Sequence, residues 1–549
     1  MTRSQTAVAA TIFFAAVLAL FLSFDFSGDY AINDDWGYST PVRWWVVDRQ
    51  RALTHWQSMP LLSQLFLGVA WAEVFGFSQG ALRQLNLVLA LTTCAAVFAC
   101  ARALALPASI CLLCALLPLA SPIFVGLSYS FMTDVPTAAL VALSLLFLIR
   151  SFSRHDGGGW DYAVGVAFLL LAVLLRQTSL ALALALVLAE PVARGFTLRG
   201  FARNLAVVVG VAAAYLAATA LLREQVGLPT AYGAKTDALV GFFGDIFTLN
   251  LGALRQTLKA LLVASANYGL FALAILPILL EVLWRRGGRR VLIAAGAATG
   301  LAVASLAVDA GILSGTGGNM LTGEGLGPRT IPGDVQVNVL DIFFVTAVGH
   351  FVLVCSVLAG ALGLRDLSNG DRDIERETGA AVLLLALTAL VTFAPHAVAY
   401  AAVFDRYALL PSILMVLALL RIIDLDAISK TSIRLSGALV LAGFALSLAL
   451  AADYFRWQDA RYSLIGQLQS EGVAAEDIDG GFEYNNLEAV LANPRDAVSM
   501  SLINPVRRPL RLTRAPEPGD EIVAMESYTR FLGAKTVKIY AVRPADVVQ

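Results

Sequence analysis

Long apolar stretches separated by short polar segments occupy most of the chain and predict its architecture. A membrane-spanning helix needs about 20 apolar residues, and the hydrophobic pattern predicts about 13 such spans. They cover residues 7–25, 82–104, 107–125, 136–150, 160–175, 178–193, 204–222, 258–283, 290–309, 340–364, 379–402, 407–423 and 435–453. The sequence therefore predicts a mostly α-helical, polytopic membrane protein.

The charges of the connecting segments predict the orientation of these spans. Cytoplasmic loops carry an excess of Lys and Arg, and the loops on one predicted side are nearly all basic, most clearly the block Arg285–Arg290. We therefore expect the N-terminus and these loops inside. The chain beyond Asp453 then lies outside, as do the segments 26–81, 126–135, 223–257 and 310–339.

The first external segment has a pattern of its own. Residues 41–51 and 59–75 alternate apolar and polar positions with a helical period. Four tryptophans lie in or beside these two stretches: Trp44, Trp45, Trp56 and Trp71. Because tryptophan prefers the membrane interface, we expect two helices that lie along the outer surface of the membrane.

The C-terminal segment is much more polar than the rest of the chain. Runs of β-type residues at 521–525 and 536–542 are separated by Gly and Pro, which is typical of short strands. The sequence therefore predicts a transmembrane domain over residues 1–453 and a small external α/β domain over residues 454–549.

Composition agrees with a membrane protein. The chain is 58% hydrophobic and only 14% charged, with a mean hydropathy of +0.74, whereas soluble domains are about a quarter charged. The net charge of −1 gives no indication of a nucleic-acid partner. All five cysteines lie in apolar stretches, so we expect buried thiols rather than disulfides.

Two adjacent carboxylates follow the first predicted span. Asp34 and Asp35 belong to the sequence NDDWGY at residues 33–38, together with Trp36. Acids this close to a bilayer usually meet a cation, a proton or a substrate hydroxyl. The alternative is a polar turn that simply ends the helix.

Other polar residues are predicted at the same outer face. They are Asp134 at the fourth span, Arg176 and Gln177 between the fifth and sixth, Asp405, Arg406 and Tyr407 ahead of the twelfth, and His55 and Gln57 after the first surface helix. Charged residues near hydrocarbon tend to face a protein cavity. Acids and arginines in one cavity suit a substrate with an anionic phosphate beside a hydroxyl that loses its proton. Alternatively, Arg176 and Arg406 only extend toward the interface.

This pattern resembles the GT-C glycosyltransferases. The acid pair after the first span, the surface helices and the Asp134-Val135-Pro136 sequence are similar to the bacterial glycosyltransferase family 39 group. That group is related to protein O-mannosyltransferases and to the aminoarabinose transferase of lipid A. The stretch FDRYALLP at 404–411 is similar to the family's Arg-Tyr-Leu-Pro motif, and residues 478–485 resemble the external domain of some bacterial members.

The resemblance implies an inverting enzyme of the bacterial inner membrane. Such enzymes transfer a sugar from a polyprenyl-phosphate carrier to a lipid, glycan or protein acceptor at the outer, periplasmic face. It implies that Asp34 is the catalytic aspartate, Asp35 the acid after it, and Asp134 the acid of the second loop. The residues expected to bind substrate are Arg176, Gln177, Arg406, Tyr407, His55 and Trp36. The chain has His55-Trp56-Gln57 where the family often has His-Pro-Pro.

A transporter or flippase is the alternative function, because it would also have many spans and intramembrane arginines. Transporters usually place ionisable groups near the bilayer midplane and have broken helices or internal repeats. In this chain the charges gather at one predicted face and no repeat is visible. The pattern therefore favours the enzyme.

Two further features bear on cofactors and on access to the site. The sequence has no His/Cys/carboxylate spacing typical of a strong structural metal site, so no metal ligand is predicted, although a divalent ion is compatible with such an enzyme. The glycine-rich segment Gly323–Arg329 lacks the lysine and the strand-to-helix setting of a phosphate-binding loop. We expect it to be a mobile external loop and a candidate lid.

Overall fold

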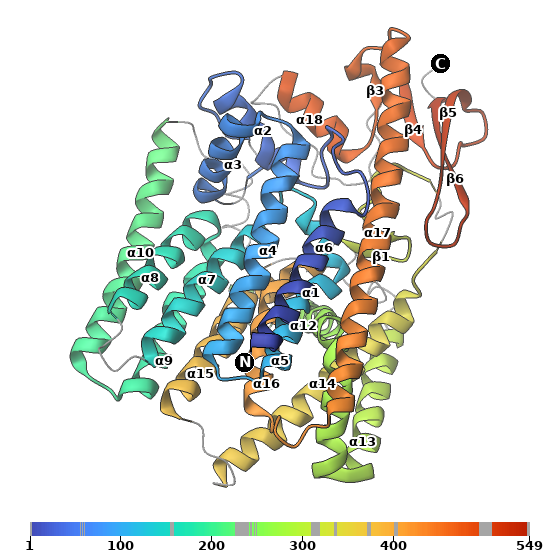
Figure 1. Cartoon of the computed structure of the whole chain (residues 1–549). Helices are drawn as coiled ribbons and strands as arrows, with labels where there is room; N and C mark the ends of the chain where they lie inside the picture. Colours follow the sequence, from blue (N-terminus) through green and yellow to red (C-terminus); the bar gives the residue numbers. More distant parts are fainter. Residues whose placement is uncertain are drawn as a thin grey trace.

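The computed structural model shows a bundle of long helices with a small sheet at one end (Figure 1). It describes the chain except residues 1–2, 55, 58, 60, 154–158, 226–240, 242–243, 246–247, 249, 309–318, 334–337, 370–374, 400–403, 493–507 and 546–549. The bundle helices are α1 (Arg3–Leu22), α4 (Gln79–Ala103), α7 (Asp134–Phe152), α8 (Gly159–Leu175), α9 (Leu180–Arg194), α10 (Leu198–Gln225), α12 (Leu251–Ala272), α13 (Leu276–Val308), α14 (Ile342–Ser368), α15 (Arg376–Ala399), α16 (Leu409–Ile422) and α17 (Lys430–Ser470). The predicted class, a mostly α-helical membrane protein, is confirmed.

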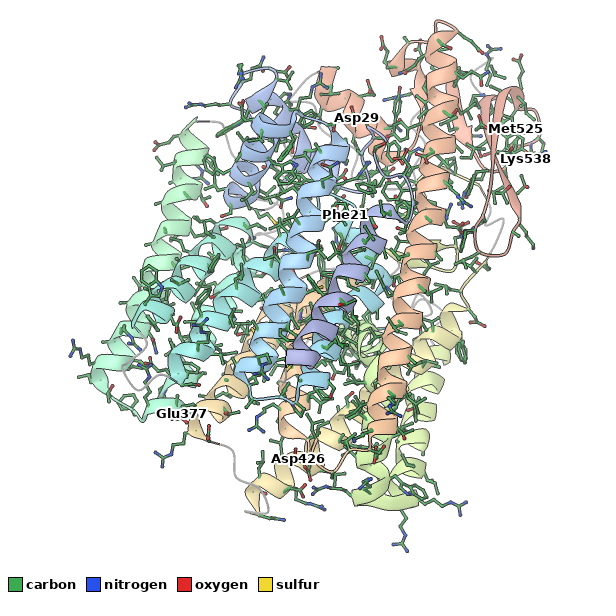
Figure 2. The ribbon with its side chains drawn as sticks, viewed as in Figure 1. Phe21, Asp29, Glu377, Asp426, Met525 and Lys538 are labelled. Atoms are coloured by element: carbon green, nitrogen blue, oxygen red, sulfur yellow. The ribbon has the colours of Figure 1, made fainter. Side chains whose placement is uncertain are left out.

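Within the described residues, eight helical stretches are long and apolar enough to cross a membrane. Three shorter apolar helices accompany them, at Thr11–Leu22, Leu62–Phe75 and Gly159–Leu175. These lengths do not establish the predicted number of 13 spans. Charged side chains lie at the two ends of the bundle, with Asp29 at the upper end and Glu377 and Asp426 at the lower end (Figure 2).

One predicted span is not a single helix. Residues 107–125 form the short helix α5 (Ala108–Leu116), the 3-10 turn η1 (Pro118–Ala120) and part of α6 (Pro122–Ser128). Pro118 and Pro122 stand at the start of η1 and α6. A proline has no N–H to donate and ends the helix that precedes it, so the expectation of one continuous span was wrong.

The basic block Arg285–Arg290, predicted as a cytoplasmic loop, lies within α13. The helix bends there because Gly288 has φ 62° and ψ −165°, a conformation that glycine adopts without steric cost. The two halves of α13 correspond to the end of one predicted span and to the next. The block therefore marks a turn between two helical segments, as its charge predicted.

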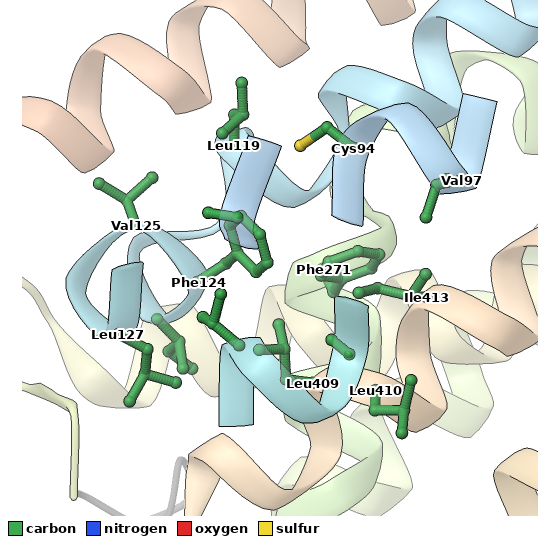
Figure 3. Close-up of a cluster of buried hydrophobic side chains, with 14 of the residues drawn as sticks. Cys94, Val97, Leu119, Phe124, Val125, Leu127, Phe271, Leu409, Leu410 and Ile413 are labelled. Carbon is green, nitrogen blue, oxygen red and sulfur yellow. The ribbon is translucent and has the colours of Figure 1, made fainter. Parts of the chain in front are cut away.

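Close backbone contact and buried side chains hold the bundle together. A Cβ atom built on Gly269 of α12 would lie 1.7 Å from the carbonyl oxygen of Gly349 in α14, so the two backbones touch, as small residues allow in membranes. Figure 3 shows a buried cluster in which Cys94, Phe124, Phe271 and Leu409 pack together with their neighbours. Leu409 and Leu410 of this cluster follow shortly after Arg406 and Tyr407 in the chain, so this core anchors the segment that carries these two residues.

The two predicted surface helices are present at the upper end of the bundle (Figure 1). They are α2 (Asp35–Val46) and α3 (Leu62–Phe75), which pack on each other. The first helix begins six residues earlier than the predicted residue 41, directly after Asp34. Asp34 is therefore the N-cap residue of the helix and Asp35 its first residue, so both acids lie at a helix N-terminus.

The C-terminal segment forms a small sheet beside the extended end of α17, with strand order β3-β4-β6-β5. Its elements are η6 (Ala475–Asp477), β3 (Ile478–Asp479), α18 (Phe482–Ala492), β4 (Leu510–Thr513), β5 (Glu521–Thr529) and β6 (Thr536–Arg543). The predicted strands at 521–525 and 536–542 fall inside β5 and β6. Helix α17 continues past residue 453 to Ser470, so the predicted domain boundary lies within one unbroken helix.

Candidate active site

Two acid–arginine pairs lie at the upper end of the bundle. The Nη2 atom of Arg406 donates to Oδ2 of Asp34 at 2.9 Å, and Nη1 of Arg176 donates to Oδ1 of Asp134 at 2.7 Å. All four side chains are at least half-buried, and Asp34, Asp134 and Arg406 are at most 6% exposed. Ion pairs this far from solvent are strong only when their geometry is good, and both distances are short.

The aromatic ring of Tyr407 joins the two pairs. Its centroid lies 5.4 Å from the guanidinium carbon of Arg176 and 5.5 Å from that of Arg406, which is cation–π distance. Burial and the nearby Asp34 carboxylate both raise the pKa of Tyr38. Four residues from distant parts of the chain therefore gather in one cluster, as the sequence predicted for Asp34, Asp134, Arg176 and Arg406.

Local structure explains why Asp34 is available for this pairing. Aspartate is a favoured N-cap because its carboxylate can accept from the helix N–H groups. Asp34 occupies the N-cap position of α2 but makes no side-chain cap bond, and its carboxylate contacts Arg406 instead. Asp134 begins α7, and its Oδ2 atom has no hydrogen-bond partner among the described residues.

Arg406 has donors that the described protein atoms do not use. Its Nε atom is buried without a hydrogen-bond partner in the described part of the chain, and Nη1 contacts only the sulfur of Met132, at 3.8 Å. A guanidinium has five N–H donors. Arg406 can therefore bind an additional anion while it stays close to Asp34.

Asp35 has a different environment from Asp34. Its Oδ1 accepts from the backbone N–H of Ile32 at 2.6 Å and its Oδ2 from that of Phe131 at 3.3 Å. Burial raises the pKa of Asp35 to about 7, and the nearby Arg83 and these two amides oppose that shift. Asp35 thus ties the segment that precedes α2 to the 129–133 loop and holds Asp34 and Asp134 in place.

This arrangement predicts different effects at the two neighbouring acids. We expect Asp35→Asn to lower protein stability by about 1–3 kcal/mol at pH 8, because the new NH₂ group would face a backbone N–H and leave it unpaired. Asp34→Asn keeps an oxygen for Arg406 and should cost less. Thermal unfolding of both variants in the same detergent checks this, and equal losses would contradict the assignment of Asp35 to positioning.

Two polar residues that the sequence analysis missed also hold the 129–133 loop. The amide nitrogen of Asn86 donates to the carbonyl oxygens of Ser130 and Met132, and that of Gln64 donates to the carbonyl oxygen of Phe131 at 2.8 Å. Asn86 lies inside the predicted span 82–104. A polar residue within a span was the available signal, since such residues usually have a buried partner.

Arg83, also missed, organises the segment that leads to the acid pair. It is fully buried and donates to the carbonyl oxygens of Phe26 at 2.8 Å and Gly28 at 2.5 Å, and also to that of Tyr30. Its guanidinium lies 4.8 Å from the ring centroid of Tyr30 and 5.4 Å from that of Phe455. Three carbonyl groups bound to one cation fix the backbone just before Asp34.

The glycine-rich segment predicted to be a mobile loop is buried and anchored. Residues 321–326 form the hairpin of β1 (Leu321–Thr322) and β2 (Gly325–Leu326). The carboxylate of Asp405 accepts from the N–H of Met320 at 2.9 Å and of Leu321 at 2.7 Å, while burial raises the pKa of Asp405 to about 6. The expectation of a mobile lid at Gly323–Arg329 was therefore wrong, because this acid, next to Arg406, fixes the hairpin.

The remaining predicted residues lie in different places. Gln177 begins the turn η2 (Gln177–Ser179) next to Arg176. Trp36 is fully buried, with its ring 5.5 Å from Trp56 and 6.1 Å from Phe482 of α18, so it packs the surface loop against the C-terminal segment. His55 lies outside the described residues.

An apolar groove has a lining residue, Ala408, two positions after Arg406 in the chain. A cavity of about 540 Å³ lies between α12, α14, α15 and α16, and its lining includes Ala408, Pro411, Met415, Leu419 and Ile422 along α16. Ala408 is the last residue of η5 (Asp405–Ala408), the turn that contains Arg406. From this turn the groove follows α16 for about 20 Å, at 1.5 Å per residue.

The described residues contain no group of three or more His, Cys, Asp or Glu side chains that could hold a metal ion. Asp34 and Asp134 each have an arginine as their charged partner.

Part of the chain matches a known family. Residues 59–222 match the family model described as dolichyl-phosphate-mannose-protein mannosyltransferase. The matched segment includes α3, the 129–133 loop, Asp134 and Arg176. The predicted resemblance to GT-C membrane glycosyltransferases of the protein O-mannosyltransferase type is thereby confirmed over this segment.

Solved structures of similar proteins were also found. A crystal structure of ArnT from Cupriavidus metallidurans bound to undecaprenyl phosphate is 12% identical, with a TM-score of 0.41 and 97% of each chain covered. The apo structure of ArnT from the same organism is 11% identical, with a TM-score of 0.41 and 99% of each chain covered. No curated protein matches the chain.

Proposed function

We propose that this protein is an inverting glycosyltransferase that moves a sugar from a polyprenyl-phosphate carrier to an acceptor hydroxyl at the outer face of the membrane. The observation that carries the proposal is the pair of buried acid–arginine contacts, Asp34–Arg406 and Asp134–Arg176, together with an apolar groove whose lining begins at Ala408, two residues after Arg406. The family match over residues 59–222 supports sugar transfer. A charged head group and a long apolar tail are the two parts of such a carrier.

The arginines suit the phosphate of the carrier. Arg406 has unused buried donors, and Arg176 contacts the same Tyr407 ring as Arg406 does. Arginine binds phosphate well because its planar fork donates two parallel hydrogen bonds. As the bond between the sugar and the phosphate breaks, both guanidinium groups would balance the charge that develops on the leaving phosphate.

Asp34 is suited to act as the general base of the reaction. In the resting arrangement its carboxylate is neutralised by Arg406 at 2.9 Å. A donor phosphate that engages Arg406 would weaken this contact and leave Asp34 free to accept the proton of the acceptor hydroxyl. The acceptor oxygen then forms its bond to the anomeric carbon as the bond to phosphate breaks, which inverts that carbon. This order implies that the donor binds before the acceptor.

Asp134 holds Arg176 and leaves one carboxylate oxygen without a described partner. That oxygen can accept a hydrogen bond from a sugar hydroxyl of the donor. Asp35 contacts backbone amides, and we assign it to positioning.

The apolar groove is suited to hold the polyprenyl tail. A substitution that fills the groove should therefore slow transfer from a long-chain donor more than transfer from a short-chain donor. We expect Ala264→Phe, which adds a ring to the groove lining, to lower transfer from a long-chain donor about tenfold or more, as added bulk excludes the tail. Transfer from a short-chain analogue should change little. Initial rates with both donors check this.

The control for the groove variant is Ala213→Phe on the exposed side of α10, which makes the same substitution away from the groove. It should leave both rates unchanged. Equal losses with the short and the long donor in Ala264→Phe would show that the groove does not hold the tail.

The broken helix formed by α5, η1 and α6 is a feature that transporters also have. Transporters, however, collect ionisable groups near the middle of the membrane. The acid–arginine pairs here lie at one end of the bundle, at the N-termini of α2 and α7. The position of the charges therefore favours the enzyme over the transporter.

We also propose that the acid–arginine site and the C-terminal sheet face the outside of a bacterial inner membrane. The N-terminus and the sheet lie at opposite ends of the bundle (Figure 1), and the basic turn at Arg285–Arg290 marks the cytoplasmic side. A reporter that works only in the cytoplasm should be silent when fused after Gln549 and active when inserted at Gly288. Activity of the fusion after Gln549 would contradict this orientation.

A further inference from the structure

A polar pocket lies at the opposite end of the bundle from the acid–arginine site. It has a volume of about 570 Å³ and lies between the last turn of α9 and the first turn of α10, at the lower end of these helices in Figure 1. Its lining includes Glu190, Arg194, Arg199, Gly200 and Arg203. The proposed transfer reaction uses none of these residues.

The chain forms this pocket by a sharp turn between two helices. Helix α9 ends at Gly195, which has φ +77°, and glycine adopts this left-handed conformation without steric cost. Thr197 starts α10 by accepting from the N–H of Gly200 at 3.1 Å through its hydroxyl. The turn brings Arg194 and Arg199, from two different helices, to the same cavity.

The pocket carries a positive charge that its own acid does not balance. Among the described residues, Glu190 is the only acid that lines the pocket, and this carboxylate contacts Arg203, Asn204 and, at 3.7 Å, Arg194. One carboxylate against three guanidinium groups leaves two positive charges. Arg199 is exposed and has no ion pair or hydrogen bond to a described residue. The N-terminus of α10 adds its positive dipole end to the same cavity.

The surface around the pocket is apolar and faces away from the protein. Over its membrane-spanning stretch α10 is only 11% buried in the bundle. Large apolar side chains near the pocket are exposed, including Leu188 at 59%, Phe196 at 70% and Leu198 at 75%. In a membrane this surface contacts acyl chains, so the positive pocket lies where lipid head groups are found.

We propose that this pocket binds a phosphate group, with Arg199 and Arg194 as its ligands. Arginine guanidinium groups recognise phosphate by charge-assisted hydrogen bonds, and basic pockets between helices at a membrane surface bind anionic lipid head groups. The exposed apolar side chains favour a phospholipid as the source of the phosphate. A soluble phosphate compound is the other source of the same chemistry.

The test measures phosphate binding at Arg199 with a matched control. Native mass spectrometry of the full chain would count retained phosphatidylglycerol, compared with phosphatidylcholine, in the wild type, in Arg199→Gln and in Arg290→Gln. Arg290 is an exposed arginine at the basic turn of α13, so its loss changes the charge of the same end of the molecule without touching the pocket. We expect phosphatidylglycerol to bind about tenfold more weakly to Arg199→Gln and nearly unchanged to Arg290→Gln.

A second experiment distinguishes the two sources of the phosphate. The protein is titrated with inorganic phosphate alone, and its thermal unfolding is measured. Stabilisation that depends on Arg199 in this titration assigns the pocket to a soluble phosphate compound, whereas an effect seen only with phosphatidylglycerol assigns it to a lipid. Equal losses in Arg199→Gln and Arg290→Gln, or no loss in either, would overturn the proposal. Sugar transfer should be normal in Arg199→Gln, so this result is independent of the proposed function.

Discussion

Replacement of Asp34 by asparagine is expected to lower the rate of sugar transfer about 10²–10⁴-fold, the usual contribution of a positioned general base. An amide has nearly the same shape as a carboxylate but cannot accept the acceptor's proton. Its oxygen can still accept from Arg406, which now contacts Asp34 at 2.9 Å, so the fold should be retained. Donor binding should be unchanged or stronger, because Arg406 no longer has a charged partner in the protein.

The measurements for this variant are single-turnover rates and donor affinity in purified protein. The matched control is Asp366→Asn, which alters another buried aspartate paired with an arginine, Arg286, at the other end of the bundle. That variant should transfer sugar at a normal rate. Near-normal turnover in Asp34→Asn with unchanged expression would show that Asp34 is not the base.

Removal of Arg406 is expected to weaken donor binding about ten- to a hundredfold. A hydrogen bond to a charged group contributes about 1.5–3 kcal/mol, and each 1.4 kcal/mol is about a tenfold change in affinity. Arg406→Ala alone would leave Asp34 buried without a partner, which costs about 3–5 kcal/mol of stability. The cleaner comparison is the double variant Asp34→Asn/Arg406→Ala against Asp34→Asn.

This comparison isolates the phosphate contact, because neither protein has a carboxylate at residue 34. Donor affinity is measured by titration calorimetry, and the same pair of changes at Asp366 and Arg286 is the control. Identical donor affinities in Asp34→Asn and in the double variant would show that Arg406 only anchors the start of α16.

Much of the architecture could be predicted because hydrophobic length and helical period are local properties. The long helices, the surface helices α2 and α3, and the strands β5 and β6 lie close to where the pattern placed them. The gathering of Asp34, Asp134, Arg176 and Arg406 was predictable for a related reason. Charges at one membrane face have little room except around a shared cavity.

The different environments of Asp34 and Asp35 could not be predicted in this way. The two acids are adjacent in sequence, and only the start of α2 directs one carboxylate to Arg406 and the other to the amides of Ile32 and Phe131. The contact with Ile32 is local, but the contacts with Arg406 and Phe131 come from tertiary structure. The contact by which Asp405 anchors the glycine-rich hairpin could not be predicted either, because Leu321 and Asp405 are 84 residues apart in the chain.

The continuous helix α17 has a consequence for the relation between the membrane and the C-terminal sheet. It runs for 41 residues, and an α-helix turns by 100° and rises 1.5 Å with each residue. The number of residues in α17 therefore sets the height and the direction of the sheet that packs against its C-terminal end. One residue inserted between Leu450 and Asp453 would rotate the sheet about 100° around the bundle. Seven inserted residues would move the sheet about 10 Å along the helix axis and leave its direction nearly unchanged. The direction in which the sheet faces therefore depends on the number of residues in a membrane helix.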